Sequence, residues 1–194
     1  MFELLTRQIR TRSVADIKTE LPFKKETDSV ESMRQQMVDN FIKKGAYQGK
    51  SLEQYSQKLL SQLAKVKEIS QGAFFISDTK DGKPVIKFLT GFASPDTGNS
   101  TDFLELGEGF PGQVAKDGTL MNISDIPQGY LSIESGLGKA SPASLIIFPV
   151  KFNDQVLAVI ELASFHKFTC DDELFFREIS PSIAEQMQKC IVKF

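Results

Sequence analysis

Hydrophobic positions are densest between residues 144 and 165, in the stretch SLIIFPVKFNDQVLAVIELASF. Two apolar runs flank Asn153 and Asp154, a dipeptide that tolerates the positive φ of a tight hairpin turn. Because the runs show almost no polar alternation, both faces of these strands should be covered. The pattern predicts a β-hairpin at the centre of a sheet.

Shorter apolar runs predict further strands before that hairpin, two of them joined by the strong turn signal Asp81-Gly82. The expected strands lie at residues 73–77, 85–92, 103–106 and 120–123, with a helical turn at 111–116. The passage 125–143 shows no regular pattern. A passage of this length inside a compact domain is usually a functional lid, although its own side chains can fill it.

Amphipathic periodicity predicts helices on either side of the sheet region. The helix at 28–44 carries the stripe Val30, Met33, Met37 and Phe41, and a second helix opens at Ser51. The last helix repeats apolar residues every four positions, and Pro181 inside it should cause a kink or a restart capped by Ser180.

These elements predict an α+β fold, in which a central antiparallel sheet of about six strands has the N- and C-terminal helices on one face and an irregular lid on the other. The expected domain organisation is a linker or weak helix at 1–27 and one domain at 28–194. Within that domain, helices span 28–70, sheet and lid span 72–165, and the C-terminal helix spans 171–193.

Composition narrows the function. The 194 residues are 41% hydrophobic with 16 Phe, enough for one sizeable core. The net charge of −2 argues against nucleic-acid binding, which needs a surplus of Lys and Arg on one face. No apolar run of membrane-spanning length and no signal-peptide core occur, so we expect no membrane insertion and a cytoplasmic location, with Cys170 and Cys190 as reduced thiols.

One polar residue stands out in the second arm of the central hairpin. Glu161 interrupts a run that is otherwise apolar and should share a face with Leu157, Val159 and Ala163. A buried carboxylate needs a partner, so Glu161 either holds a ligand or accepts hydrogen bonds from backbone N–H groups of the lid. Tyr130 is the lid side chain expected to reach toward it. The candidate pocket combines apolar walls and polar handles: Phe92, Phe110, Ile126, Tyr130, Ser132, Ser135 and Glu161.

The order of several motifs resembles that of GAF domains. Gly107-Glu-Gly-Phe-Pro-Gly-Gln-Val-Ala115 is followed by Ile126-Pro127, by the two strands of the central hairpin, and by Phe168 with Asp172 four residues later. The similarity covers roughly 51–191 and looks closest to GAF modules of bacterial sensor histidine kinases, where a segment like 135–142 also occurs.

This resemblance implies a sensory module of a signal-transduction protein, such as a two-component system, rather than an enzyme. Such modules bind a small molecule between sheet and lid, here an unidentified one with no cofactor assigned, or relay a signal as dimers. We expect a homodimer formed through the N-terminal and C-terminal helices, and a downstream signalling domain or protein as partner.

Two alternative ligands follow from the same resemblance. The segment from Phe168 to Glu173 matches the Phe-x-x-x-Asp-Glu end of the motif in nucleotide-binding GAF domains. The preceding Asn-Lys pair is missing, since Lys167 adjoins Phe168 and His166 stands where the Asn would be. The other interpretation is that Phe168 fills the core while Asp171 and Asp172 cap the last helix. Covalent bilin attachment is disfavoured, because no cysteine precedes Cys170.

An enzymatic alternative is a free methionine sulfoxide reductase, since some GAF domains use a thiolate nucleophile with a resolving cysteine. That chemistry needs an accessible thiol of low pKa beside the pocket. Cys170 and Cys190 lie far from the lid in sequence, and His166 has no metal ligand at suitable spacing. We therefore expect no catalytic residue and no metal site.

Overall fold

The computed structural model describes residues 32, 51–93, 103–135 and 138–191. The predicted helix at 28–44, with its apolar stripe, lies outside these residues except for Ser32. Eleven elements follow one another along the described chain: α2 Leu52–Lys67, β1 Gln71–Lys80, β2 Lys83–Phe92, β3 Phe103–Glu105, α3 Gly109–Asp117, β4 Met121–Ile123, β5 Ile133–Ser135, β6 Gly138–Ala140, β7 Ser144–Phe152, β8 Gln155–Ser164 and α4 Cys170–Ile191.

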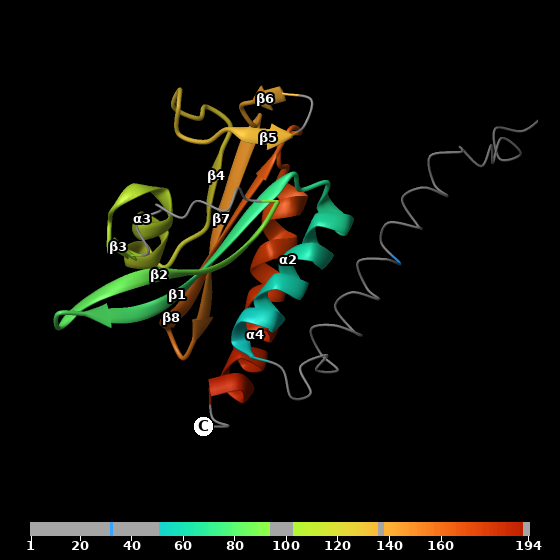
Figure 1. The fold of residues 1–194 in the computed structure, drawn as a ribbon. Helices are drawn as coiled ribbons and strands as arrows, with labels where there is room; N and C mark the ends of the chain where they lie inside the picture. The colour runs from blue at the N-terminus through green and yellow to red at the C-terminus, as the bar shows by residue number, and fades with distance from the viewer. Residues whose placement is uncertain (1–31, 33–50, 94–102, 136–137, 192–194) are drawn as a thin grey trace, which may run out of the picture.

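Six strands form one antiparallel sheet in the order β3-β2-β1-β8-β7-β4, and β5 and β6 form a separate small hairpin. The long helices α2 and α4 lie side by side on one side of the sheet, while α3 lies on the other (Figure 1). We call these the helix side and the lid side, and we keep the name lid for residues 125–143. The predicted α+β architecture is confirmed.

The central hairpin forms at the predicted residues. Asn153 and Asp154 both have positive φ, 48° and 62°, and connect β7 to β8, which are interior strands. The pairing register shifts between Val150 and Lys151, so that Leu157 is an extra residue on β8. This β-bulge moves Leu157 toward the helix-side core, and the expectation that it shares a face with Glu161 is wrong.

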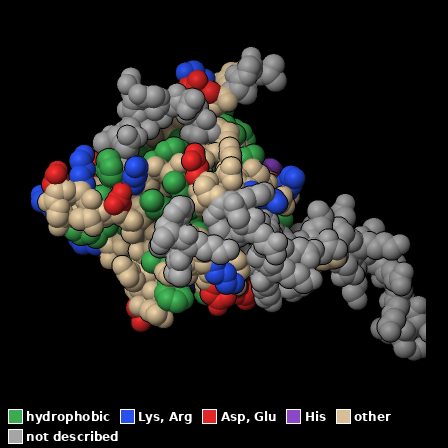
Figure 2. Space-filling model, turned by 60° about the horizontal axis from the view of Figure 1, so that its bottom comes forward, with side chains coloured by type: hydrophobic (Ala, Val, Ile, Leu, Met, Phe, Trp, Pro, Cys, Tyr) green, Lys and Arg blue, Asp and Glu red, His purple; other side chains and the backbone are tan. Residues whose placement is uncertain are grey.

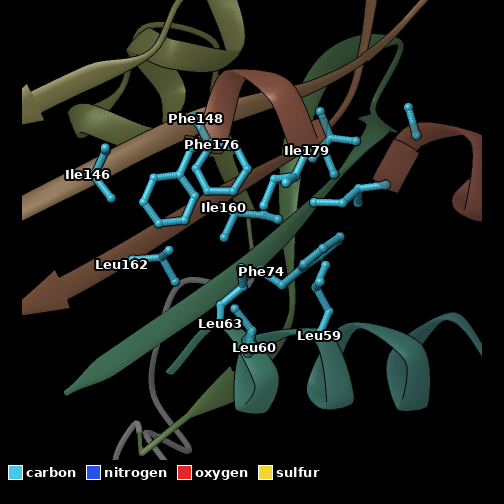
Figure 3. Close-up of a cluster of buried hydrophobic side chains, with 14 of the residues drawn as sticks. Leu59, Leu60, Leu63, Phe74, Ile146, Phe148, Ile160, Leu162, Phe176 and Ile179 are labelled. Carbon is cyan, nitrogen blue, oxygen red and sulfur yellow. The ribbon is translucent and has the colours of Figure 1, made fainter. Parts of the chain in front are cut away.

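The helix side contains the larger core. In Figure 3, leucines of α2 and Phe176 and Ile179 of α4 close over side chains of β1, β7 and β8. The Phe148 and Phe176 rings stack with centroids 5.0 Å apart. At Gly72 an added Cβ would lie 3.0 Å from the Leu162 side chain and 3.4 Å from Leu60, so a glycine lets α2 approach the sheet closely.

Both long helices begin at capped positions. Ser51 and Gln54 form a capping box at α2, and Thr169 and Asp172 exchange equivalent hydrogen bonds at the start of α4. The expected restart at Pro181 is wrong, because α4 runs unbroken through it. Ser180 does not cap a new helix; its hydroxyl donates instead to the Pro149 carbonyl oxygen at 2.7 Å.

On the lid side, α3 is anchored at Gly112. An added Cβ there would stand 2.5 Å from the carbonyl oxygen of Glu105, closer than any side chain tolerates, so only glycine lets α3 dock on the end of β3. The Gly107 amide donates to the Gly112 carbonyl at 2.8 Å and closes the loop. This docking fixes Phe110, at the start of α3, over the sheet. The lid is less irregular than expected, since it contains the β5–β6 hairpin.

Candidate functional site

Glu161 lies on the lid side of an interior strand. It faces Ala73 of β1 and Ile147 of β7 in the pairing register, and its same-face neighbours Val159 and Ala163 are buried. The sheet therefore presents a carboxyl group next to buried apolar side chains of its own strand. Such a group is costly to keep charged without partners.

The lid supplies one partner for that carboxyl. The Tyr130 hydroxyl donates a hydrogen bond to Glu161 Oε1 at 2.9 Å. The Tyr130 ring packs against Phe110, with centroids 4.7 Å apart, and its amide bonds to the Pro127 carbonyl oxygen at 3.1 Å in a turn. Glu161 thus meets a lid side chain rather than the lid backbone N–H groups considered from the sequence, and α3 helps to hold that side chain in place.

Burial changes the acidity of both groups. Burial raises the pKa of Glu161 from 4.5 to about 7, and the hydrogen bond from Tyr130 opposes this only in part. The pKa of Tyr130 is also raised, first by burial and then by the neighbouring Glu161 carboxylate. Near neutral pH, Glu161 is therefore present in both its protonated and its ionised form, while Tyr130 keeps its proton and stays a hydrogen-bond donor.

Gln71 is a polar group on the same face that the sequence analysis missed. It precedes Ala73 by two positions on β1, pairs with Ala163, and so stands diagonally beside Glu161. Its side chain is buried, with the residue 7% exposed, and Oε1 has no hydrogen-bond partner among the described residues. The predicted strand began at Ala73, two residues too late to include Gln71. Had the strand been extended back to Gln71, the alternation of faces would have placed Gln71 on the lid side.

The sheet surface beside Glu161 is made of small residues. Ala73 of β1 and Gly91 of β2 stand in one row with Glu161, since Gly91 pairs with Ala73 and Ala73 pairs with Glu161. Two adjacent strands therefore carry nothing larger than a methyl group next to the carboxyl. We call Glu161, Tyr130, Phe110, Gln71 and Ala73 the Glu161 site.

The remaining predicted pocket residues do not all join this site. Ile126 packs on the lid-side core, Ser132 is exposed, and Ser135 belongs to β5 through its backbone pairing with Gly138. The prediction that Phe92 forms a wall of the pocket is wrong, because Phe92 packs against the helix-side core. The register of β1 and β2 shifts between Phe74 and Phe75, and this bulge turns Phe92 to the opposite face from Phe88.

The Phe168–Glu173 segment lies away from the Glu161 site. Phe168 is buried in the helix-side core, as one interpretation expected. Asp172 forms a largely buried ion pair with Lys67 of α2 and accepts hydrogen bonds from Thr169. The lysine partner of this aspartate therefore comes from α2 and not from Lys167.

The two thiols and the histidine also lie elsewhere. Cys190 is buried in the helix-side core, and Cys170 is exposed at the first residue of α4. His166 is exposed, with Nε2 3.4 Å from a Glu68 carboxylate oxygen. No group of three or more metal-ligating side chains occurs among the described residues.

A separate cavity of about 460 Å³ opens between the β1–β2 turn, the end of α3 and the β7–β8 turn. Val156, which lines it, precedes Glu161 by five residues on β8, or about 16 Å along a strand. Its charged lining residues are exposed or partly exposed and of both signs: Asp78, Lys116, Asp117, Lys151 and Asp154. Figure 2 likewise shows acidic and basic side chains interspersed over the visible face.

A sequence model of the GAF domain family matches residues 49–187. The chain therefore belongs to the GAF domain family, in agreement with its six-stranded sheet and the placement of its helices. No curated protein matches the chain. None of the helices in the described ranges is long and apolar enough to cross a membrane.

Solved structures with the same fold include proteins of different activity. The GAF domain of a phosphoenolpyruvate-protein phosphotransferase from Coxiella burnetii is 16% identical, with a TM-score of 0.66 over 84% of this chain and 95% of that one. A free methionine-R-sulfoxide reductase from Neisseria meningitidis is 14% identical, with a TM-score of 0.65 over 83% and 92%. The A. aeolicus nlh2 GAF domain is 16% identical, with a TM-score of 0.62 over 82% and 98%. At these identities the likeness concerns the fold alone.

Proposed function

We propose that this chain is a non-catalytic regulatory module that binds a small molecule over Glu161 and responds through its lid. The observation that carries this proposal is the hydrogen bond between Tyr130 and Glu161. It joins a segment of the lid to the middle of the sheet through a single partly exposed side chain. A molecule that competes for the Glu161 carboxyl would release Tyr130 and with it the lid.

Such a ligand acts by population shift. The lid closed on Glu161 and the lid released from it are two states, and a ligand moves the balance only by its difference in affinity for the two. Tyr130 is 36% exposed, so the contact is reachable from solvent. The small side chains of Ala73 and Gly91 leave the neighbouring sheet surface available to the rest of the ligand.

The proposal excludes thiol catalysis at this site. The chain has two cysteines, and the buried Cys190 is separated from Glu161 by the sheet itself. Cys170 belongs to α4, which packs on the helix side. Consumption of free methionine sulfoxide by the purified chain with a thiol reductant would overturn this part of the proposal.

We further propose that the module works as a cytoplasmic homodimer, coupled to a downstream signalling domain or protein. Leu174 of α4 is 57% exposed and is the most exposed large hydrophobic side chain of the described residues. Leu174 therefore gives α4 an exposed apolar position that could join the stripe expected at 28–44 in a dimer interface. Light scattering should show a dimer that Met33→Asp together with Met37→Asp dissociates; a monomer at high micromolar concentration would contradict it.

The binding proposal is tested with ¹⁵N-labelled protein and a library of small metabolites. A ligand should shift backbone amides of β1, β8 and the Tyr130 turn in a saturable way, and Phe110→Ala should weaken its binding. The matched control is Phe165→Ala, since Phe165 is exposed just after β8. A library whose hits all map to α2, α4 or the cavity near Lys116 would remove the proposal.

A further inference from the structure

Two side chains with hydrogen-bond acceptors, Gln71 and Glu161, lie diagonally opposite on adjacent strands of the lid side. Among the described residues, Gln71 Oε1 is buried with no partner, and the Glu161 carboxyl accepts a hydrogen bond from Tyr130 at one of its two oxygens. Buried polar groups in proteins are nearly always hydrogen-bonded, so the unpaired carbonyl oxygen of Gln71 needs an explanation. Because Gln71 lies diagonally beside Glu161 on the adjacent strand, one ligand group can contact both side chains.

Resting on the function proposed above, we propose that the ligand carries a primary ammonium group, which Gln71 Oε1 and the Glu161 carboxylate hold together. An ammonium group has three N–H donors and no acceptor, so it can serve both oxygens at once. A hydroxyl group has one donor, and a carboxylate has none. Of these groups, only the ammonium also neutralises the charge of Glu161.

The charge balance of the site supports a cation. Tyr130 is the single described side chain that acts on the ionisation of Glu161, and it is a neutral donor. A carboxylate in an apolar setting is stabilised by an opposite charge at hydrogen-bond distance. An ammonium ligand therefore favours ionised Glu161, and its binding should strengthen as pH rises through about 7.

The sheet surface beside Glu161 determines the shape of the rest of the ligand. Ala73 and Gly91 extend the Glu161 row across β1 and β2, and the Phe110 ring lies beside Tyr130. A short unbranched carbon chain attached to the ammonium group would lie on this surface of small side chains. The chemical class is thus a small aliphatic amine.

The test uses three probes of one shape: n-butylammonium, 1-butanol and butyrate. Each is titrated into ¹⁵N-labelled full chain one pH unit above the pKa of Glu161, which is about 7. The expected result is saturable shifts of the Gln71 side-chain amide and of the Ala73 and Glu161 backbone amides with n-butylammonium. Equal shifts with 1-butanol or butyrate would overturn the ammonium class while leaving small-molecule binding over Glu161 intact.

Variants distinguish the loss of either acceptor from a general disturbance of core packing. Gln71→Leu and Glu161→Gln should each weaken n-butylammonium binding about 10- to 100-fold, the usual effect of a hydrogen bond to a charged group. The matched control is Gln186→Leu, because Gln186 is also buried with an unpaired Oε1 but belongs to α4. Unchanged affinity in Gln71→Leu, or an equal loss in Gln186→Leu, would overturn the assignment. So would no shift with n-butylammonium at all.

Discussion

On the helix side of the sheet, Ile146, Phe148 and Ile160 are fully covered by α2 and α4. On the lid side, the position next to Ile160 along β8 is Glu161, held by a single side chain of the lid. Neighbouring residues of one strand thus face a closed apolar core and a polar site beneath a lid. The difference indicates that the helix side supplies the stability that lets the lid side keep an unfavourable carboxyl and an unpaired Gln71.

The largest expected effect comes from opening the helix side. Phe148→Ala removes a ring that is 1% exposed and stacked on Phe176, and should lower the free energy of unfolding by about 3–5 kcal/mol. Phe152→Ala, on the same strand but 37% exposed, should cost less than about 1 kcal/mol. Urea denaturation of both variants measures the contrast. Equal losses would mean that the helix side is not the main source of stability.

A second variant tests the polar contact that the helix side does contain. Lys67→Met leaves Asp172 buried without its lysine and should cost about 3 kcal/mol, at the lower end for a broken buried pair. Asp172 keeps its hydrogen bonds from Thr169 at the favourable N-terminus of α4, which limits the loss. Lys65→Met is the control, since Lys65 is exposed on the same helix. Thermal unfolding with no difference between the two would contradict this.

Much of this contrast was predictable from local sequence. The hairpin at 144–164 follows from Asn153-Asp154 between two apolar runs, and the side of Glu161 follows from strand alternation. Both wrong placements, Leu157 and Phe92, result from β-bulges, which shift the alternation by one residue and leave no clear sequence signal. The partner of Asp172 was hidden for another reason, because Lys67 is 105 residues away in the chain.

The carboxyl group on the lid side should make the stability of the protein depend on pH. Folding raises the pKa of Glu161 from 4.5 to about 7, so the folded state binds more protons than the unfolded state between these values. Stability should therefore be highest below this window, fall as pH rises through it, and level off above about 7. The expected loss is on the order of 2 kcal/mol, below the full value of the shift because Glu161 is partly exposed.

Glu161→Gln removes the titrating group while keeping an oxygen that can accept from Tyr130. This variant should lose the pH dependence within that window and be more stable than the parent chain above it. Denaturation curves at several pH values measure both effects. A parent chain whose stability rises with pH across the same window would show that Glu161 is held as a carboxylate in the folded state.

The smallest effect concerns the hydroxyl of Tyr130 alone. Its hydrogen bond favours ionised Glu161, so Tyr130→Phe should move the pKa of Glu161 further upward and cost about 1 kcal/mol where Glu161 is ionised. The cost should shrink at low pH, where a protonated Glu161 gains less from a donor. The ¹³C resonance of the Glu161 carboxyl carbon follows the titration directly. Ser132→Ala, at an exposed position of the lid, should leave that titration unchanged. An unchanged pKa of Glu161 in Tyr130→Phe would mean that this hydroxyl does not hold the lid on the sheet. The packing of the Tyr130 ring on Phe110 would then be the contact that holds it.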